Sequence, residues 1–387
     1  MFIAFVGFQF FNPFLPLYVR ELGVTDPAHV ALWSGLLAAV TPALSGVLAP
    51  LSGRLADRFG LKLMLIRSLA GFTVIIAAMG LVTSVQQLFV ARALQGLFAG
   101  FSPMAMAVAS VSAPREKVSV AIARVQGAQL ISVAVGPALG GLVASRFGTR
   151  AAFMVTAALC AVSLVALLVL FREARPRDPG EARATALATP LRQFLRYRHF
   201  VPVMILLVIA QFIDRGLALM IPLHVAHLPG VVEIAATSGI IISVAAVGAA
   251  ISAHVVARLS VAIPIGRLLL VEFAVGGAAC GAMALTASAM GLLLLRTVVA
   301  LCLGGALTLA YSLGGMIVPG EARGAAFGWL ALGVQIGTAA SPLLTGALAA
   351  VSLANAYFMD AALAWLAAAV LALGARDLLR RREPRGA

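Results

Sequence analysis

Ionisable side chains inside long apolar runs are the residues of this sequence best suited to chemistry. Three carboxylates lie in such runs, namely Asp214, Glu272 and Asp360, and two basic residues, Arg92 and Arg296, share this setting. A charged group is costly in an apolar environment, so such groups are usually paired or mark a path for ions, protons or substrates. An acid in a low-dielectric site also binds its proton more tightly unless a cation lies near, which would let it exchange a proton at physiological pH.

Asp214 stands in Gln211-Phe212-Ile213-Asp214-Arg215-Gly216, near the middle of an apolar run. Neighbouring helical positions point about 100° apart, so Asp214 and Arg215 need not bridge each other. Gln211 and Asp214 are three residues apart and share a helix face. This pattern predicts either a proton or cation site or a structural ion pair at Asp214. Asp360 begins a later run and is assigned a proton-coupling role, with a simple boundary position as the alternative, whereas Glu272 is interpreted as structural.

The elements that carry these residues are membrane spans. The chain of 387 residues is 62% hydrophobic and only 11% charged, against about 25% charged residues in an average soluble domain. A span needs about 20 mostly apolar residues, so with short loops the chain can hold about twelve. The predicted spans are 2–20, 30–51, 64–83, 87–110, 120–144, 151–171, 200–225, 235–257, 267–287, 289–312, 324–349 and 355–375.

The formal net charge of +14 follows the membrane topology and does not indicate a nucleic-acid partner. If Met1 begins inside, nearly all Arg and Lys residues fall in cytoplasmic segments, and only Arg20, Arg146 and Arg150 fall outside. This positive-inside bias places both termini in the cytoplasm. The expected partners are the lipid bilayer, a small-molecule substrate and protons, with no nucleic acid, and the expected state is a monomer.

The two halves of the chain repeat each other at an offset of about 205 residues. Arg92 corresponds to Arg296, and Gly136-Pro137 corresponds to Ser341-Pro342. An ordered repeat over the whole chain predicts an all-α membrane protein with two pseudo-symmetric six-helix bundles and a central site. The predicted domains are an N-terminal bundle (1–171), a cytoplasmic linker (172–199), a C-terminal bundle (200–375) and a basic cytoplasmic tail (376–387).

A charged island at 53–62 separates the second and third predicted spans. By itself it is a tight loop that carries positive-inside charges. Its pattern also resembles the loop signature of the major facilitator superfamily, although Leu61 departs by standing where the family often has a basic residue. The resemblance implies a gate loop in which the acid pairs with basic groups and helix ends on the cytoplasmic face. The gate residues are Gly53, Arg54, Asp57, Arg58, Gly60 and Lys62.

Two further motifs resemble this family. Arg92 and the following Gln95-Gly96 are similar to its buried-arginine motif, which implies a role in proton coupling, and the alternative is a structural arginine bound to carbonyl groups. Gly136, Pro137, Gly140 and Gly141 resemble the fifth-helix motif of the drug:proton antiporters, which is associated with export and with sealing the interface between the halves. The bland alternative is a bent packing helix, because glycine allows close helix approach and proline bends the helix.

Polar side chains on apolar spans define a candidate substrate cavity. Its predicted members are Gln9, Asn12, Gln95, Gln126, Gln129, Gln211, Arg215 and Gln335. The sequence contains no nucleotide-binding loop, no metal-ligand pattern and no cofactor motif, so an ion gradient should supply the energy. The whole-chain resemblance implies a bacterial inner-membrane exporter of hydrophobic or cationic drugs. A proton-coupled transporter of one metabolite, such as a sugar or organic acid, remains the alternative, and an enzyme is disfavoured because the five histidines form no cluster with acids.

Overall fold

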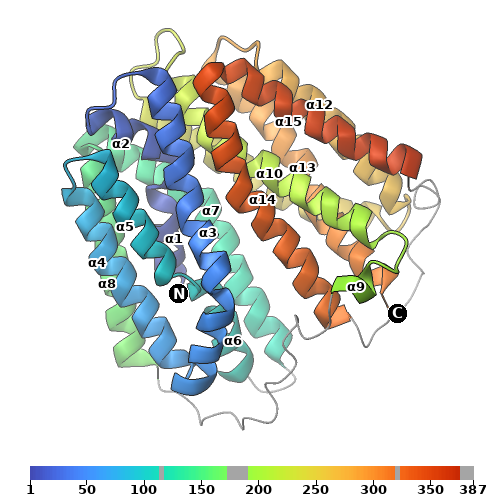
Figure 1. The fold of residues 1–387 in the computed structure, drawn as a ribbon, viewed down its shortest axis with the longest axis horizontal. Coiled ribbons are helices and arrows are strands. Elements are labelled where there is room, and N and C mark those ends of the chain that lie inside the picture. The colour runs from blue at the N-terminus through green and yellow to red at the C-terminus, as the bar shows by residue number, and fades with distance from the viewer. Residues whose placement is uncertain (113–116, 172–190, 319–322, 375–387) are drawn as a thin grey trace. The chain divides into compact units, whose positions relative to one another are not determined.

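The computed structural model describes residues 1–112, 117–171, 191–318 and 323–374, which form helices and no strands (Figure 1). Two compact units make up the chain. The first unit comprises 1–183 and 231–243, and the second comprises 184–230 and 244–387.

The first unit contains eight helices and the beginning of a ninth. They are α1 (Phe2–Phe10), α2 (Leu15–Glu21), α3 (Pro27–Phe59), α4 (Leu61–Leu81), α5 (Val85–Leu97), α6 (Phe101–Ser112), α7 (Val118–Phe147) and α8 (Thr149–Leu170), with the start of α11 (Ile234–Leu259). The turn between α1 and α2 contains Asn12-Pro13, where proline removes a backbone donor and interrupts the helix.

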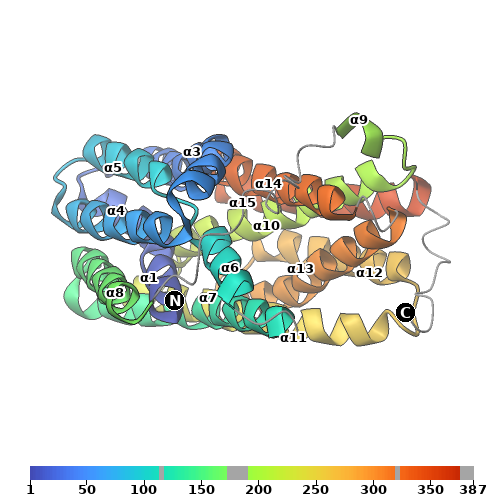
Figure 2. The ribbon, with the colours of Figure 1, turned by 90° about the horizontal axis from the view of Figure 1, so that it is seen from below.

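The second unit contains the remaining helices and the end of α11, which Figure 2 labels. They are α9 (Leu191–Phe194), α10 (Phe200–Val225), α12 (Ile265–Met283), α13 (Ala289–Ile317), α14 (Arg323–Val351) and α15 (Leu353–Ala369), which continues as one π-helical turn over Val370–Gly374.

Twelve helical segments within the described residues are long and apolar enough to cross a membrane, from Phe2–Glu21 to Leu353–Leu373. The sequence-based prediction of an all-α membrane protein with twelve spans is therefore confirmed.

Small residues set the closest helix contacts in each unit. In the first unit α1 packs on α7, and a methyl group built on Gly140 of α7 would overlap the carbonyl oxygen of Phe10 on α1. In the second unit α10 packs on α14 (Figure 1), and a methyl group on Gly216 of α10 would lie 2.7 Å from Thr345 Oγ1 on α14. The same contact of the repeat is thus made in both units. In the second unit glycines of both helices contribute, because a methyl group on Gly337 of α14 would lie 2.6 Å from the Val208 carbonyl oxygen of α10.

Helix starts also follow the repeat. The Ser84 hydroxyl accepts a hydrogen bond from the Gln87 N–H at the start of α5, and the Ser288 hydroxyl accepts one from Gly291 at the start of α13. Serine is a favoured N-cap because its oxygen satisfies a backbone donor that the first turn leaves unpaired.

The charged island at 53–62 is more helical than the predicted loop. Helix α3 continues to Phe59, α4 begins at Leu61, and Gly60 alone links them with φ 85° and ψ 154°. Arginine, leucine and alanine are good helix formers, so charge by itself does not end a helix. The predicted tight turn is correct at Gly60, but Gly53 lies within α3 rather than in a turn.

Candidate functional site

A buried ion pair joins two helices of the second unit. Nη2 of Arg296 on α13 lies 2.7 Å from Oδ1 of Asp214 on α10. The Arg296 side chain is only 5% exposed, whereas the Asp214 side chain is 38% exposed. Arg215, which follows Asp214 in the sequence, is exposed. The ion-pair alternative for Asp214 is therefore what the geometry contains, and its partner is 82 residues away along the chain.

Asp360 of α15 belongs to the same group of charges. It is fully buried, and it interacts electrostatically with Arg296. Among the described residues neither of its carboxyl oxygens has a hydrogen-bond partner. The Nε and Nη1 atoms of Arg296 also have no partner. Oδ2 of Asp360 lies 3.5 Å from the position that a methyl group on Gly216 would take, and Thr345 Oγ1 lies 2.7 Å from that position. The Arg296 guanidinium therefore interacts with the carboxyl groups of both Asp214 and Asp360. Asp360 lies in the buried core of the second unit.

Gln211 lies beside this charge cluster, which we define as Asp214, Arg296 and Asp360. It is buried on α10, and its Cβ lies 3.3 Å from the position of a methyl group on Gly337 of α14. Gln335, also on α14, is exposed. The close approach of α10 and α14 thus covers Gln211. The side chain of Asp214, three residues later, stays partly exposed.

Arg92 of α5 is the corresponding buried arginine of the first unit. Its Nε donates to the Leu37 carbonyl oxygen at 3.0 Å, and its Nη1 donates to Gln95 Oε1 at 2.9 Å and Asn12 Oδ1 at 3.2 Å. The guanidinium also lies 5.6 Å from the centroid of the Phe11 ring. These acceptors are neutral oxygens, and within the described residues Arg92 makes no ion pair. The contacts therefore favour the structural alternative for Arg92.

The predicted cavity residues of the first unit have different surroundings. Asn12 and Gln95 use their amide oxygens on Arg92, and the Asn12 amide nitrogen donates to the Phe8 carbonyl oxygen at 2.7 Å. The Cβ of Gln9 lies 2.7 Å from the position of a methyl group on Gly136. Gln126 is exposed and Gln129 is half-buried on α7. The cavity itself draws on residues of both units and stays a prediction.

The fifth-helix motif of α7 contacts two other helices of the first unit. Gly136 and Gly140 face α1, whereas a methyl group on Gly141 would lie 2.5 Å from the Ala235 carbonyl oxygen at the start of α11. The Ala138 N–H, which follows Pro137, donates to the Ser243 hydroxyl of α11 at 3.0 Å. The motif is therefore a packing surface on two sides.

The gate residues are described only in part. The side chains of Arg54 and Asp57 lie outside the described part of the structure, as do the surroundings of Gly53, so the predicted pairing of Asp57 stays a prediction. Lys62 Nζ donates to the carbonyl oxygen of Phe171, which follows α8, at 2.6 Å. The Arg58 guanidinium lies 5.3 Å from the centroid of the neighbouring Phe59 ring.

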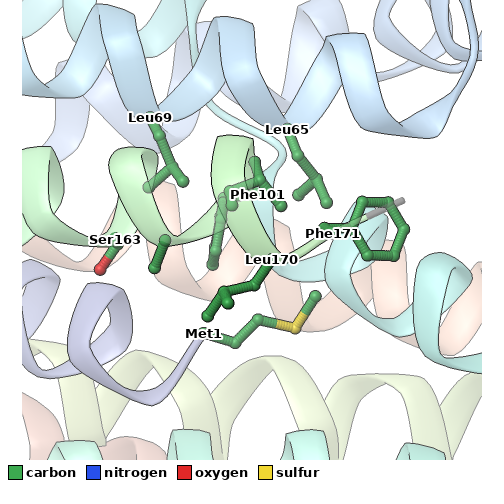
Figure 3. Close-up of a pocket in the computed structure, with 9 residues that line it drawn as sticks. Met1, Leu65, Leu69, Phe101, Ser163, Leu170 and Phe171 are labelled. Carbon is green, nitrogen blue, oxygen red and sulfur yellow. The ribbon is translucent and has the colours of Figure 1, made fainter. Parts of the chain in front are cut away.

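An apolar cavity of about 270 Å³ lies in the first unit between α4, α6 and α8 and the start of α1 (Figure 3). Its lining is almost entirely aliphatic and aromatic, with Ser163 as the one hydroxyl: Met1, Leu65, Leu69, Phe101, Ser163, Ala166, Leu167, Leu170 and Phe171. The lining side chains are uncharged and nearly all apolar, so this cavity suits a hydrocarbon group.

The surroundings of two polar residues of the second unit escaped sequence reasoning. His224, which has no acid near it in the sequence, accepts at Nδ1 from the Tyr357 hydroxyl and donates from Nε2 to the Thr286 carbonyl oxygen, both at 3.0 Å. A carbonyl can only accept, which fixes this arrangement of donors. Glu272, interpreted as structural, is buried with neither carboxyl oxygen bonded. The only signal in the sequence was the presence of polar residues in apolar spans.

Twelve apolar helices within the described residues, with charges buried among them, define an integral membrane protein. The model of the Major Facilitator Superfamily matches residues 1–294, and the chain belongs to this family of secondary transporters.

Two multidrug resistance proteins are similar to this chain over most of its length. The multidrug resistance protein MdtG of Rahnella sp. (strain Y9602) is 31% identical over 362 residues, which cover 90% of this chain and 87% of the relative. MdtG of Erwinia billingiae (strain Eb661) is 34% identical over 275 residues, which cover 69% of this chain and 65% of the relative.

Among solved structures, a bacterial homologue of the human lysosomal transporter Spinster, in an inward-facing and occupied conformation, matches with a TM-score of 0.79. The two chains are 18% identical, and the match covers 100% of this chain and 96% of the other. At this identity the likeness shows the fold alone.

Proposed function

We propose that this chain is a drug:proton antiporter of a bacterial inner membrane, which exports hydrophobic or cationic compounds as a monomer by alternating access. The drug class rests on the MdtG relatives. The orientation, with both termini in the cytoplasm, rests on the positive-inside distribution of Arg and Lys. The division into two bundles joined by a linker at 172–199 rests on the sequence repeat.

The charge cluster is the observation that supports the proposed coupling of transport to protons. It holds one buried guanidinium and two carboxyl groups, of which only Asp214 has a bonded partner. If both acids were ionised, they would share one buried guanidinium, and the exposed Arg215 would act on Asp214 alone. The negative charge of Asp360 would then be poorly compensated, which is costly in a low-dielectric interior. A proton on Asp360 removes this excess. Protonation of Asp214 would instead release Arg296, whose Nε and Nη1 are unbonded, so the cluster can change its pairing as protons bind and leave.

Asp214 is the member of the cluster that a substrate can reach, because its side chain is 38% exposed. A cationic drug and a proton would then compete for the same carboxylate, which is the basis of exchange between them. Arg92 is bonded to neutral oxygens, so the proposal gives it the task of holding α5 to α3 and to the turn between α1 and α2. The contacts of Gly141 and Ala138 with α11 lie within the first unit and support a packing role for the fifth-helix motif. Its proposed sealing role rests on the motif resemblance.

The test is ethidium uptake into inside-out vesicles that are energised with a proton gradient. Wild type is compared with Asp214→Asn, which keeps the side-chain volume but cannot ionise. Glu233→Gln, at an exposed acid before α11, is the matched control. We expect uptake in wild type and in the control, and its loss in Asp214→Asn.

Uptake that survives in Asp214→Asn would move the coupling to Asp360. If wild type moves no dye under any gradient, the drug assignment is wrong, and transport of a specific metabolite becomes the favoured function.

A further inference from the structure

Glu272 is a second isolated acid of the second unit. It lies on α12, seven residues after the helix begins at Ile265, which is about 10 Å along the helix axis. The residue is 7% exposed, and neither Oε1 nor Oε2 has a hydrogen-bond partner among the described residues. A buried carboxyl group without a partner calls for an explanation.

The space around the Glu272 carboxyl is shaped by glycine. A methyl group on Gly305 of α13 would overlap Oε1 of Glu272, and it would lie 2.9 Å from the Ser252 hydroxyl of α11. The preceding glycine, Gly304, lets α11 approach, because a methyl group there would lie 2.6 Å from Cα of Ala249. The Gly304-Gly305 pair therefore makes a cradle for one carboxyl group between three helices.

In the part of the chain that the structure describes, no cation is bonded to the Glu272 carboxyl group. Arg267 is exposed and lies five residues before Glu272, so it points about 140° away around the helix. The buried guanidinium of Arg296 is bonded to Asp214, and it lies nine residues before Gly305, or about 14 Å along α13. The groups that face Glu272 from neighbouring helices are the Ser252 hydroxyl and the Cys302 thiol. A buried ion without a partner normally neutralises itself by binding or losing a proton.

We propose that Glu272 is a reversible proton-binding site, separate from the charge cluster. In this arrangement its carboxyl group holds a proton as the neutral acid. When the proton leaves, the O–H bond breaks, the proton passes to water and the carboxylate stays in the cradle. The buried Ser252 hydroxyl of α11 lies at the same cradle.

Infrared spectroscopy of the purified full chain in lipid bilayers tests this proposal without any transport measurement. The carbonyl stretch of a protonated carboxylic acid is distinct from the bands of a carboxylate. We expect wild type to show such a band, to lose it as the pH rises, and to shift it when D₂O replaces H₂O. Glu272→Gln, which has the shape of the neutral acid, should lack this component, whereas the exposed control Glu233→Gln should retain it.

Identical acid bands in wild type and Glu272→Gln would show that Glu272 is ionised, and this would overturn the proposal. A Glu272 band that stays unchanged at every pH at which the protein is folded would also overturn it, because the acid would then be permanent. If Glu272→Gln does not fold, Gly305→Ala serves instead. Its methyl group displaces the carboxyl group, so the band must change in frequency, and an unchanged band would refute the assignment.

Discussion

The Arg296 guanidinium and the Asp214 carboxylate, 2.7 Å apart, connect α13 to α10 across the second unit. The corresponding arginine of the first unit, Arg92, binds the Asn12 and Gln95 amides and a carbonyl instead. The repeat thus keeps a buried arginine in both halves but gives only one of them an ionisable partner. Within the described residues, a proton-binding carboxylate that pairs with one of these two arginines is therefore found only in the second unit.

Removing the arginine of this pair should destabilise the protein. Arg296→Gln removes the buried cation from Asp214 and Asp360, although the exposed Arg215 still acts on Asp214. Breaking a fully buried pair costs roughly 3–5 kcal/mol. We expect a smaller loss, because Asp214 is 38% exposed and water screens its charge. Thermal unfolding in detergent measures the effect. In the double variant with Asp214→Asn the loss should be less than the sum of the two single losses, and strict additivity would mean that the pair does not interact.

The contact of Gly140 with Phe10 predicts that glycine-to-alanine substitutions at two positions of α7 will change stability differently. Gly140→Ala places a methyl group on the Phe10 backbone, which cannot move aside easily, and overpacking of this kind costs typically 1–3 kcal/mol. Gly127→Ala is the control on the same helix, since a methyl group there meets nothing within 4 Å. Alanine is the better helix former, so the control should keep or raise stability. Equal melting temperatures for the two variants would contradict the close approach of α1 and α7.

The contacts of Arg92 predict a structural phenotype. Arg92→Lys keeps the charge, but one ammonium group cannot reproduce the fork that reaches Leu37, Asn12 and Gln95. We expect a lower melting temperature and a lower rate of dye transport, with the pH profile of transport unchanged. A shifted pH profile at normal stability would instead assign Arg92 to proton coupling.

Replacing Gly60 with any other residue should strain the backbone of the turn between α3 and α4. Its φ of 85° and ψ of 154° lie in a region that only glycine adopts readily, and a side chain there costs of order 1–3 kcal/mol. Gly60→Ala should therefore lower the melting temperature, whereas Gly46→Ala, in the interior of α3 with open space around it, should not. An unchanged melting temperature in Gly60→Ala would show that α3 and α4 are not joined by this backbone conformation.

The sequence by itself determined the class of protein and the order of its spans, because long apolar runs have few structural solutions in a membrane. It also determined the repeat, including the pair Arg92 and Arg296, since both residues interrupt apolar runs at matching places. It placed the turn near Gly60, but charge did not end α3 at residue 51, because helix propensity continued to Phe59.

Only the tertiary structure decided the partners. Asp214 is next to Arg215 in the sequence but bonds to Arg296, because neighbouring helical residues diverge while α10 and α13 pack together. Glu272 and Gly305 are likewise ordinary residues of separate spans until α12 and α13 meet. The charge state of a buried acid depends on which groups face it from other helices, and this information lies in the packing rather than in local sequence.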